Sequence, residues 1–128
     1  MNKSDISTKD DIHTLVSKFY AKVRLHDTLG PIFNTVVKDW DDHLERITLF
    51  WESNLFFRTK YFGNPLEVHT RVDQRFNNSI TQDHFGQWLN LWIETIDELH
   101  QGDYADKAKF RARKMSTFLY MKIFENRH

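Results

Sequence analysis

The chain has 128 residues, which is long enough to close one hydrophobic core and too short for two. Its 18 basic residues balance its 18 acidic residues, which argues against nucleic-acid binding, because phosphate contacts need a basic excess. It has no cysteine, so disulfides, thiolate zinc sites, iron–sulfur clusters and cysteine nucleophiles are excluded.

The N-terminal segment, residues 1–8, is polar, unlike a signal sequence, and we expect it to be flexible. A helix is predicted to follow it, with Ser7 or Thr8 as the N-cap. The apolar residues of this helix recur at alternating spacings of four and three: Ile12, Val16, Phe19 and Val23. Tyr20 lies on the flank of the same stripe. The pattern ends before Gly30–Pro31, which cannot continue a regular helix.

A second helix is predicted to begin near Asp39, where Asp41 and Asp42 suit the positive end of the helix dipole. It carries two adjoining stripes, which contain Trp40, Leu44, Ile47 and Trp51, and His43, Ile47, Phe50 and Asn54. It is predicted to end between residues 58 and 63. Asn64–Pro65 is typical of a helix start, and the short helix that follows presents Leu66, His69 and Val72 before a polar loop over residues 73–80.

Two long helices are predicted in the last third of the chain. Thr81 is the expected N-cap of the first, whose broad apolar face contains Phe85, Trp88, Leu89, Trp92, Ile96 and Leu99. Gly102–Asp103 separates it from the second, which carries Ala105, Ala108, Ala112, Met115, Leu119 and Ile123. The pattern predicts an all-helical domain of five or six helices. No apolar run approaches the roughly 20 residues that span a bilayer, so we expect a soluble, cytoplasmic protein.

Two of the seven histidines, His43 and His69, lie on or beside an apolar stripe. The others lie on polar faces or near helix ends, where we expect them to be solvated: His13, His26, His84, His100 and His128. A buried imidazole needs a hydrogen bond or a metal, because burial without a partner costs free energy. The pattern alone leaves both alternatives open, a core histidine bonded to the backbone or a metal ligand.

Tyr20 and Trp88 raise a similar question, because each carries a polar group on an apolar helix face. Each side chain could bond a carbonyl in the core, or both could point at one bound ligand. The acidic cluster around Asp39 is not a metal site, since consecutive helical residues splay around the helix axis. The sequence contains no phosphate-binding glycine loop and neither an HExxH nor a GxSxG motif.

Five segments, in this order, resemble the group III truncated haemoglobins, a bacterial branch of the globins. They are FYAKVR with Phe19–Tyr20, LGPIF with Phe33, DWDDHLERITLFW with His43, GNPLEVH with His69, and HFGQWLNLW with Trp88. The resemblance runs from about Leu15 to Met121. It implies a single all-α domain over residues 1–128, a truncated globin-like two-over-two helical sandwich enclosing haem.

The resemblance also implies that the cofactor is haem b (iron protoporphyrin IX). His69 matches the proximal histidine that bonds the iron. Arg46 falls where a basic side chain could reach a haem propionate, and Arg75 is a second candidate for that role. An abundance of aromatic residues, 15% of the chain, is what a flat apolar cavity would need.

On the distal side, Tyr20 and Trp88 match hydrogen-bond donors to the ligand, and His43 matches a histidine that swings between closed and open positions. Phe33 matches the phenylalanine that packs on the haem face, and Ile47 and Phe50 match apolar residues that line the distal pocket. Oxygen bound to haem gains negative charge, so a donor aimed at it is worth about 1.5–3 kcal/mol and slows its release.

The resemblance therefore implies a haem protein that binds oxygen and other small ligands, such as nitric oxide or carbon monoxide, and releases oxygen slowly. A haem redox enzyme is the alternative, either a nitric oxide dioxygenase served by an unidentified reductase or a peroxidase-like enzyme in which His43 moves a proton. A third possibility is a haem-free helical interaction module with His69 packed in its core. We expect no membrane partner and a monomer.

Overall fold

The computed structural model describes residues 3–56 and 80–125, and these residues form helices and no strand. The helices are α1 (Lys9–Leu25), α2 (Leu29–Val36), α3 (Trp40–Phe56), α5 (Gln82–Leu99) and α6 (Asp103–Glu125). Predictions that fall on residues 57–79, including the short helix with His69, lie outside the described residues. None of the described helices has an apolar stretch long enough to cross a membrane.

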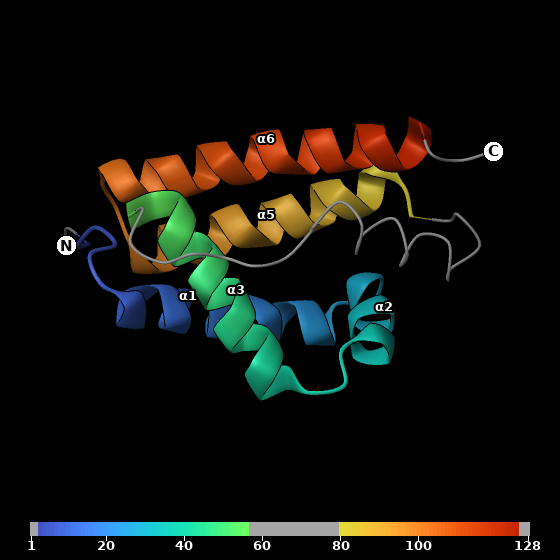
Figure 1. Cartoon of the computed structure of the whole chain (residues 1–128), viewed down its shortest axis with the longest axis horizontal. Helices are drawn as coiled ribbons and strands as arrows, with labels where there is room; N and C mark the ends of the chain where they lie inside the picture. The colour runs from blue at the N-terminus through green and yellow to red at the C-terminus, as the bar shows by residue number, and fades with distance from the viewer. Residues whose placement is uncertain (1–2, 57–79, 126–128) are drawn as a thin grey trace.

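The long helices pack as two pairs. One pair is α1 with α3, and the other is α5 with α6, which run antiparallel beside each other (Figure 1). The pairs meet where α1 packs on α5 and where α3 reaches α6, while α2 closes one end against α1 and α5. This arrangement is the predicted two-over-two helical sandwich.

The starts of the helices follow from local side-chain chemistry. Thr8 and Asp11 form a capping box on α1, because the Thr8 hydroxyl accepts from the Asp11 N–H at 3.0 Å and the Asp11 carboxylate accepts from the Thr8 N–H at 3.1 Å. Thr81 and His84 form the same box on α5. The Asp39 carboxylate accepts from the Asp42 N–H at the start of α3. The predicted helix starts at Thr8, Asp39 and Thr81 are confirmed.

The sequence places a break at Gly30–Pro31, whereas the structure places it over residues 26–28 and puts both residues inside α2. Pro31 is tolerated there because it occupies the first turn, where a backbone N–H has no partner within the helix. His26 caps the start of α2, which the sequence pattern does not indicate. Its Nδ1 accepts hydrogen bonds at 3.1 Å from the backbone N–H groups of Thr28 and Leu29.

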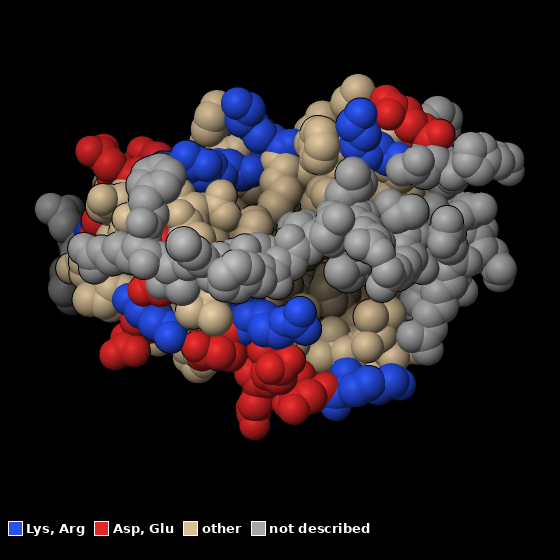
Figure 2. All heavy atoms as spheres, in the orientation of Figure 1, with Lys and Arg blue, Asp and Glu red and all other residues tan. Residues whose placement is uncertain are grey.

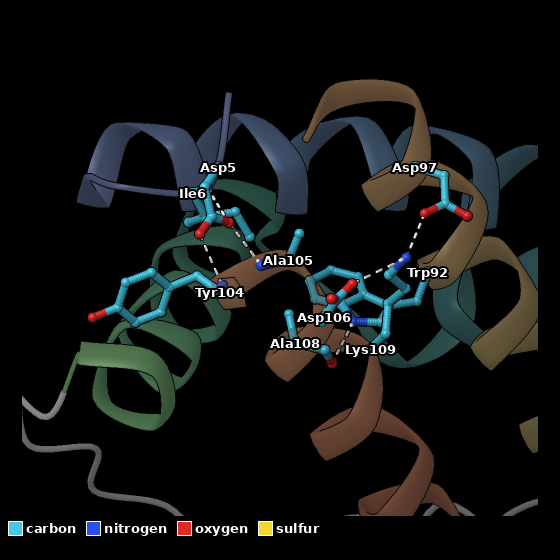
Figure 3. Close-up of polar contacts among 9 residues, drawn as sticks. All are labelled: Asp5, Ile6, Trp92, Asp97, Tyr104, Ala105, Asp106, Ala108 and Lys109. Carbon is cyan, nitrogen blue, oxygen red and sulfur yellow. Dashed lines mark hydrogen bonds and ion pairs between the residues drawn. The ribbon is translucent and has the colours of Figure 1, made fainter. Parts of the chain in front are cut away.

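Residues 3–8, in the segment that we expected to be flexible, contact α6 and the core. The Asp5 carboxylate accepts hydrogen bonds from the Tyr104 and Ala105 N–H groups, each at 2.9 Å, and so caps α6 from a distant part of the chain (Figure 3). Ile6, which follows it, is fully buried. Gly102 allows this approach, because a Cβ there would lie 2.5 Å from the Asp5 Cγ and its φ of +146° disfavours other residues.

Asp5→Ala should lower the free energy of unfolding by about 1 kcal/mol, because two N–H groups at the start of α6 lose their acceptor. Urea unfolding followed by circular dichroism measures this change. Asp27→Ala is the matched control, since Asp27 is an exposed acidic residue between α1 and α2. Equal stability of the two variants would mean that the cap contributes nothing.

The core lies where the two helix pairs meet. Its largest fully buried side chains include Phe19 and Leu15 of α1 and Trp92 and Ile96 of α5.

Basic and acidic side chains are interspersed over the face shown in Figure 2. Exposed ion pairs join neighbouring helices, among them Lys22 to Glu98 at 2.7 Å, and such pairs contribute little stability. Packing of the aromatic core therefore holds the helices together.

Candidate functional site

A cavity of about 250 Å³ is lined by residues from all of the described helices. Its wall is mainly aliphatic and aromatic. The lining side chains with hydroxyl, imidazole or guanidinium groups, among the described residues, are Tyr20, His43, Arg46, His84 and Ser116. A concave, largely apolar wall with a few polar groups is the usual character of a small-molecule site.

Every site residue that we predicted from the sequence, among the described residues, lines this cavity. These residues are Tyr20, Phe33, His43, Arg46, Ile47, Phe50 and Trp88. They come from α1, α2, α3 and α5, so residues up to 68 positions apart share one wall. Their individual roles remain predictions. His69 and Arg75 lie outside the described residues.

Tyr20 lies at the centre of an aromatic cluster and is only 5% exposed. Its ring centroid is 5.0 Å from that of His43, 5.7 Å from that of Phe33 and 5.7 Å from that of Trp40. The Arg24 guanidinium covers the Trp40 ring at 4.6 Å from the ring centroid. These contacts restrict the Tyr20 ring, because rotating it would displace neighbours on α2 and α3.

The His43 Nε2 atom is buried and has no hydrogen-bond partner among the described residues. Burial lowers the pKa of His43 below its ordinary value, the nearby Arg46 cation lowers it further, and Asp42 acts in the opposite direction. His43 is therefore neutral near pH 7. An unpartnered polar atom in an apolar wall is costly, so this nitrogen is suited to a bound ligand.

The lowered pKa of His43 makes the free energy of unfolding depend on pH. In the unfolded chain the imidazole takes up a proton at its ordinary pKa of 6.5, whereas the folded chain resists protonation until a lower pH. The unfolded state thus binds more protons between these two values, and stability falls as the pH falls through 6.5.

His43→Leu should show a smaller loss of stability than the parent chain between pH 7.5 and pH 5.5. Urea unfolding midpoints at the two pH values measure the loss of stability in each protein. Because both proteins keep the other histidines, comparing the two losses isolates the contribution of His43. Parallel losses in both proteins would show that the His43 pKa is the same in the folded and unfolded states.

Another part of the wall is built on stacked indoles of α3 and α5. The Trp88 ring is nearly parallel to that of Trp92, with centroids 6.3 Å apart, and Trp92 stacks on Trp51 at 4.8 Å. The Phe19 ring meets Trp88 edge-on at 5.6 Å. Trp92 is itself fixed, because its Nε1–H donates to the Ala108 carbonyl at 3.3 Å (Figure 3). Trp88 is thus held in one orientation at the cavity.

Arg46 lies at the outer part of the wall, with its side chain 62% exposed. Its Nη1 is 3.9 Å from the Asp42 carboxylate, one turn earlier on α3, which is a weak surface pairing. The guanidinium can therefore turn toward an acidic group at the cavity with little loss of existing contact.

Sequence reasoning missed several wall residues. His84, which we expected to be solvated, is half-buried and lines the cavity. The sequence held a signal for it, because His84 is four residues before Trp88 and so lies on the same face of α5. The apolar residues of α2 and α6 that the sequence did not assign to the site are Leu29, Ile32, Val36, Met115, Leu119 and Ile123.

No family model matches the chain. The chain is similar to the group 3 truncated hemoglobin ctb of Campylobacter jejuni subsp. jejuni serotype O:2, with 26% identity over 127 residues that cover 96% of each protein. It is also similar to the crystal structure of a group III truncated hemoglobin from Campylobacter jejuni, with a TM-score of 0.85, 26% identity and 98% of each chain covered.

Proposed function

Because the chain has the truncated-globin fold and resembles the group III truncated haemoglobins over nearly its whole length, we propose that it binds haem and a small ligand. The similarity supports a globin role in general terms. The observation that supports a specific site is the cavity, to which seven residues selected from the sequence contribute.

The described residues fit a haem group. Phe33, Ile47 and Phe50 supply apolar surface from two helices, and the Trp88 indole forms part of the same wall. The unpartnered Nε2 of His43 is a polar group that a dry cavity would leave unsatisfied. We propose that His69 bonds the iron, on the basis of the resemblance alone, since it lies outside the described residues.

Haem supplies an iron with one open position, at which a small ligand such as oxygen, nitric oxide or carbon monoxide binds. The protein's part is to exclude water and to hold donors toward that ligand. Tyr20 can donate its hydroxyl proton and Trp88 its indole N–H, and the aromatic contacts of both rings limit their movement. His43 is neutral and can also donate one N–H, depending on its tautomer.

Addition of haemin to the purified protein, followed by reduction and exposure to carbon monoxide, tests this function. We expect one haem to bind per chain and the Soret band to shift when carbon monoxide is added. Phe33→Asp provides a check on the site, because a carboxylate placed in the apolar wall should weaken haem binding. A parent chain that takes up haemin but shows no shift would contradict the small-ligand role.

A further inference from the structure

His84 is an imidazole at the cavity to which the sequence gives no role. It is the third residue of α5, it is half-buried, and it contributes to the cavity wall together with Phe85 and Trp88 of the same helix. Haem carries two carboxylate groups on its propionate arms, and a carboxylate next to an apolar wall needs hydrogen-bond donors.

The capping contacts of His84 determine which of its ring nitrogens can donate. The Thr81 backbone N–H donates to His84 Nδ1 at 2.8 Å, and the Thr81 hydroxyl lies 2.9 Å from the same nitrogen. Nδ1 must therefore carry a lone pair, so the proton of the neutral imidazole is on Nε2. The capping contact at the start of α5 thus leaves the His84 Nε2–H as a hydrogen-bond donor.

The same tautomer is unsuited to binding iron. A ligating imidazole bonds the metal through a bare nitrogen and donates its other N–H to an acceptor. In His84 the two roles are reversed, because Nδ1 accepts from the backbone and Nε2 holds the proton. Iron ligation through Nε2 would require the loss of the cap on α5. His84 is a hydrogen-bond donor here.

Arg46 and His84 are the only side chains with guanidinium or imidazole groups on the described wall apart from His43. Arg46 lies on α3 and His84 on α5, and both helices pack on α1. Haem has two carboxylate arms. Besides the buried His43, the described wall offers two side chains that can donate hydrogen bonds to them, Arg46 and His84, and these lie on separate helices.

We propose that His84 Nε2–H donates a hydrogen bond to one of the carboxylates of the bound porphyrin and so slows its release. This inference rests on the proposed haem-binding function and adds a residue that holds the acidic end of the group. Arg46 is the corresponding candidate for the second carboxylate.

Two substitutions separate the donor from the cap. His84→Glu retains an acceptor for the Thr81 N–H, which is the usual acid in a capping box, but it has no donor. His84→Gln retains the acceptor through its amide oxygen and the donor through its amide nitrogen. Both variants should fold, which helix content by circular dichroism checks.

The test compares haemin with haemin dimethyl ester, which has the same ring and iron but no free carboxylate. Transfer of each porphyrin to excess apomyoglobin measures its dissociation rate. We expect haemin to leave His84→Glu about tenfold faster than it leaves the parent chain, and His84→Gln to restore slow release. The ester should leave all three proteins at similar rates.

Equal haemin release from the parent chain and His84→Glu would overturn this inference, as would an equal acceleration for the ester. Neither result would affect the proposed function, because both require that porphyrin binds. A parent chain that binds neither porphyrin would overturn the proposed function, and this inference with it.

Discussion

Gly30→Ala should lower the free energy of unfolding by about 2 kcal/mol, because it forces a methyl group into backbone atoms. Gly30 lies in the first turn of α2, where its N–H donates to the His26 carbonyl at 2.8 Å and the chain passes close to the end of α1. A Cβ at this position would be 2.7 Å from the Arg24 carbonyl oxygen and 3.2 Å from its carbonyl carbon. Backbone atoms cannot move aside as a flexible side chain can.

Gly86→Ala is the matched control for this prediction. Gly86 is inside α5, and a Cβ added there would meet no atom of the described residues within 4 Å. Alanine there should stabilise the protein by about 0.5–1 kcal/mol, because glycine loses more backbone freedom on folding. Urea unfolding measures both changes. Two variants that shift stability in the same direction would contradict the close approach of α2 to α1.

Tyr20→Phe should speed oxygen dissociation about tenfold or more, while leaving haem content unchanged. The reason is that a hydrogen bond to a charged acceptor is worth about 1.5–3 kcal/mol, and oxygen gains negative charge on haem. Tyr20 is buried in the cavity wall beside His43 and Phe33, and we propose that it reaches the ligand from this position. Stopped-flow displacement of oxygen by carbon monoxide measures the dissociation rate.

Tyr104→Phe removes the same hydroxyl from a residue outside the cavity and serves as the control. Tyr104 is 39% exposed at the start of α6, where its ring packs on Phe56. Dissociation of carbon monoxide is a second control, because that ligand gains less charge and depends less on a donor. An unchanged oxygen dissociation rate in Tyr20→Phe would place its hydroxyl away from the ligand.

The sequence predicted much of the fold because helix periodicity and caps are local properties. The four-and-three spacing of Ile12, Val16, Phe19 and Val23 is a buried face of α1, and Thr8 and Thr81 are N-caps as expected. The all-α fold and the resemblance to group III truncated haemoglobins are confirmed by the solved structure that the chain matches. The short helix α2 was missed because Gly30–Pro31 indicates a break, and no local pattern shows that His26 caps the next turn.

Contacts between distant segments could not be predicted from local patterns. Asp5 caps α6 at a separation of 99 residues from Tyr104, and nothing near Asp5 in the sequence indicates that partner. Likewise, the alternation of Met115, Leu119 and Ile123 predicts a buried face of α6 but not that this face borders a cavity.

The candidate site was identified by two kinds of reasoning. The positions of Tyr20, His43 and Trp88 on or beside apolar stripes of α1, α3 and α5 indicate that they face the interior. All three line the cavity. Their functional roles come from the resemblance, because periodicity cannot distinguish a ligand donor from a core hydrogen bond. His84 was misjudged because its polar neighbours near the start of α5 suggested a solvated side chain.

The visible spectrum of the purified protein after addition of haemin, compared with that of His69→Ala, tests the central claim most directly. His43→Leu is the matched control, because it removes an imidazole that lines the same cavity. We expect an intense Soret band in the parent chain and in His43→Leu, and its loss or a large shift in His69→Ala. A colourless parent chain that rejects haemin would contradict haem binding, and a His69→Ala spectrum identical to that of the parent would contradict ligation by His69.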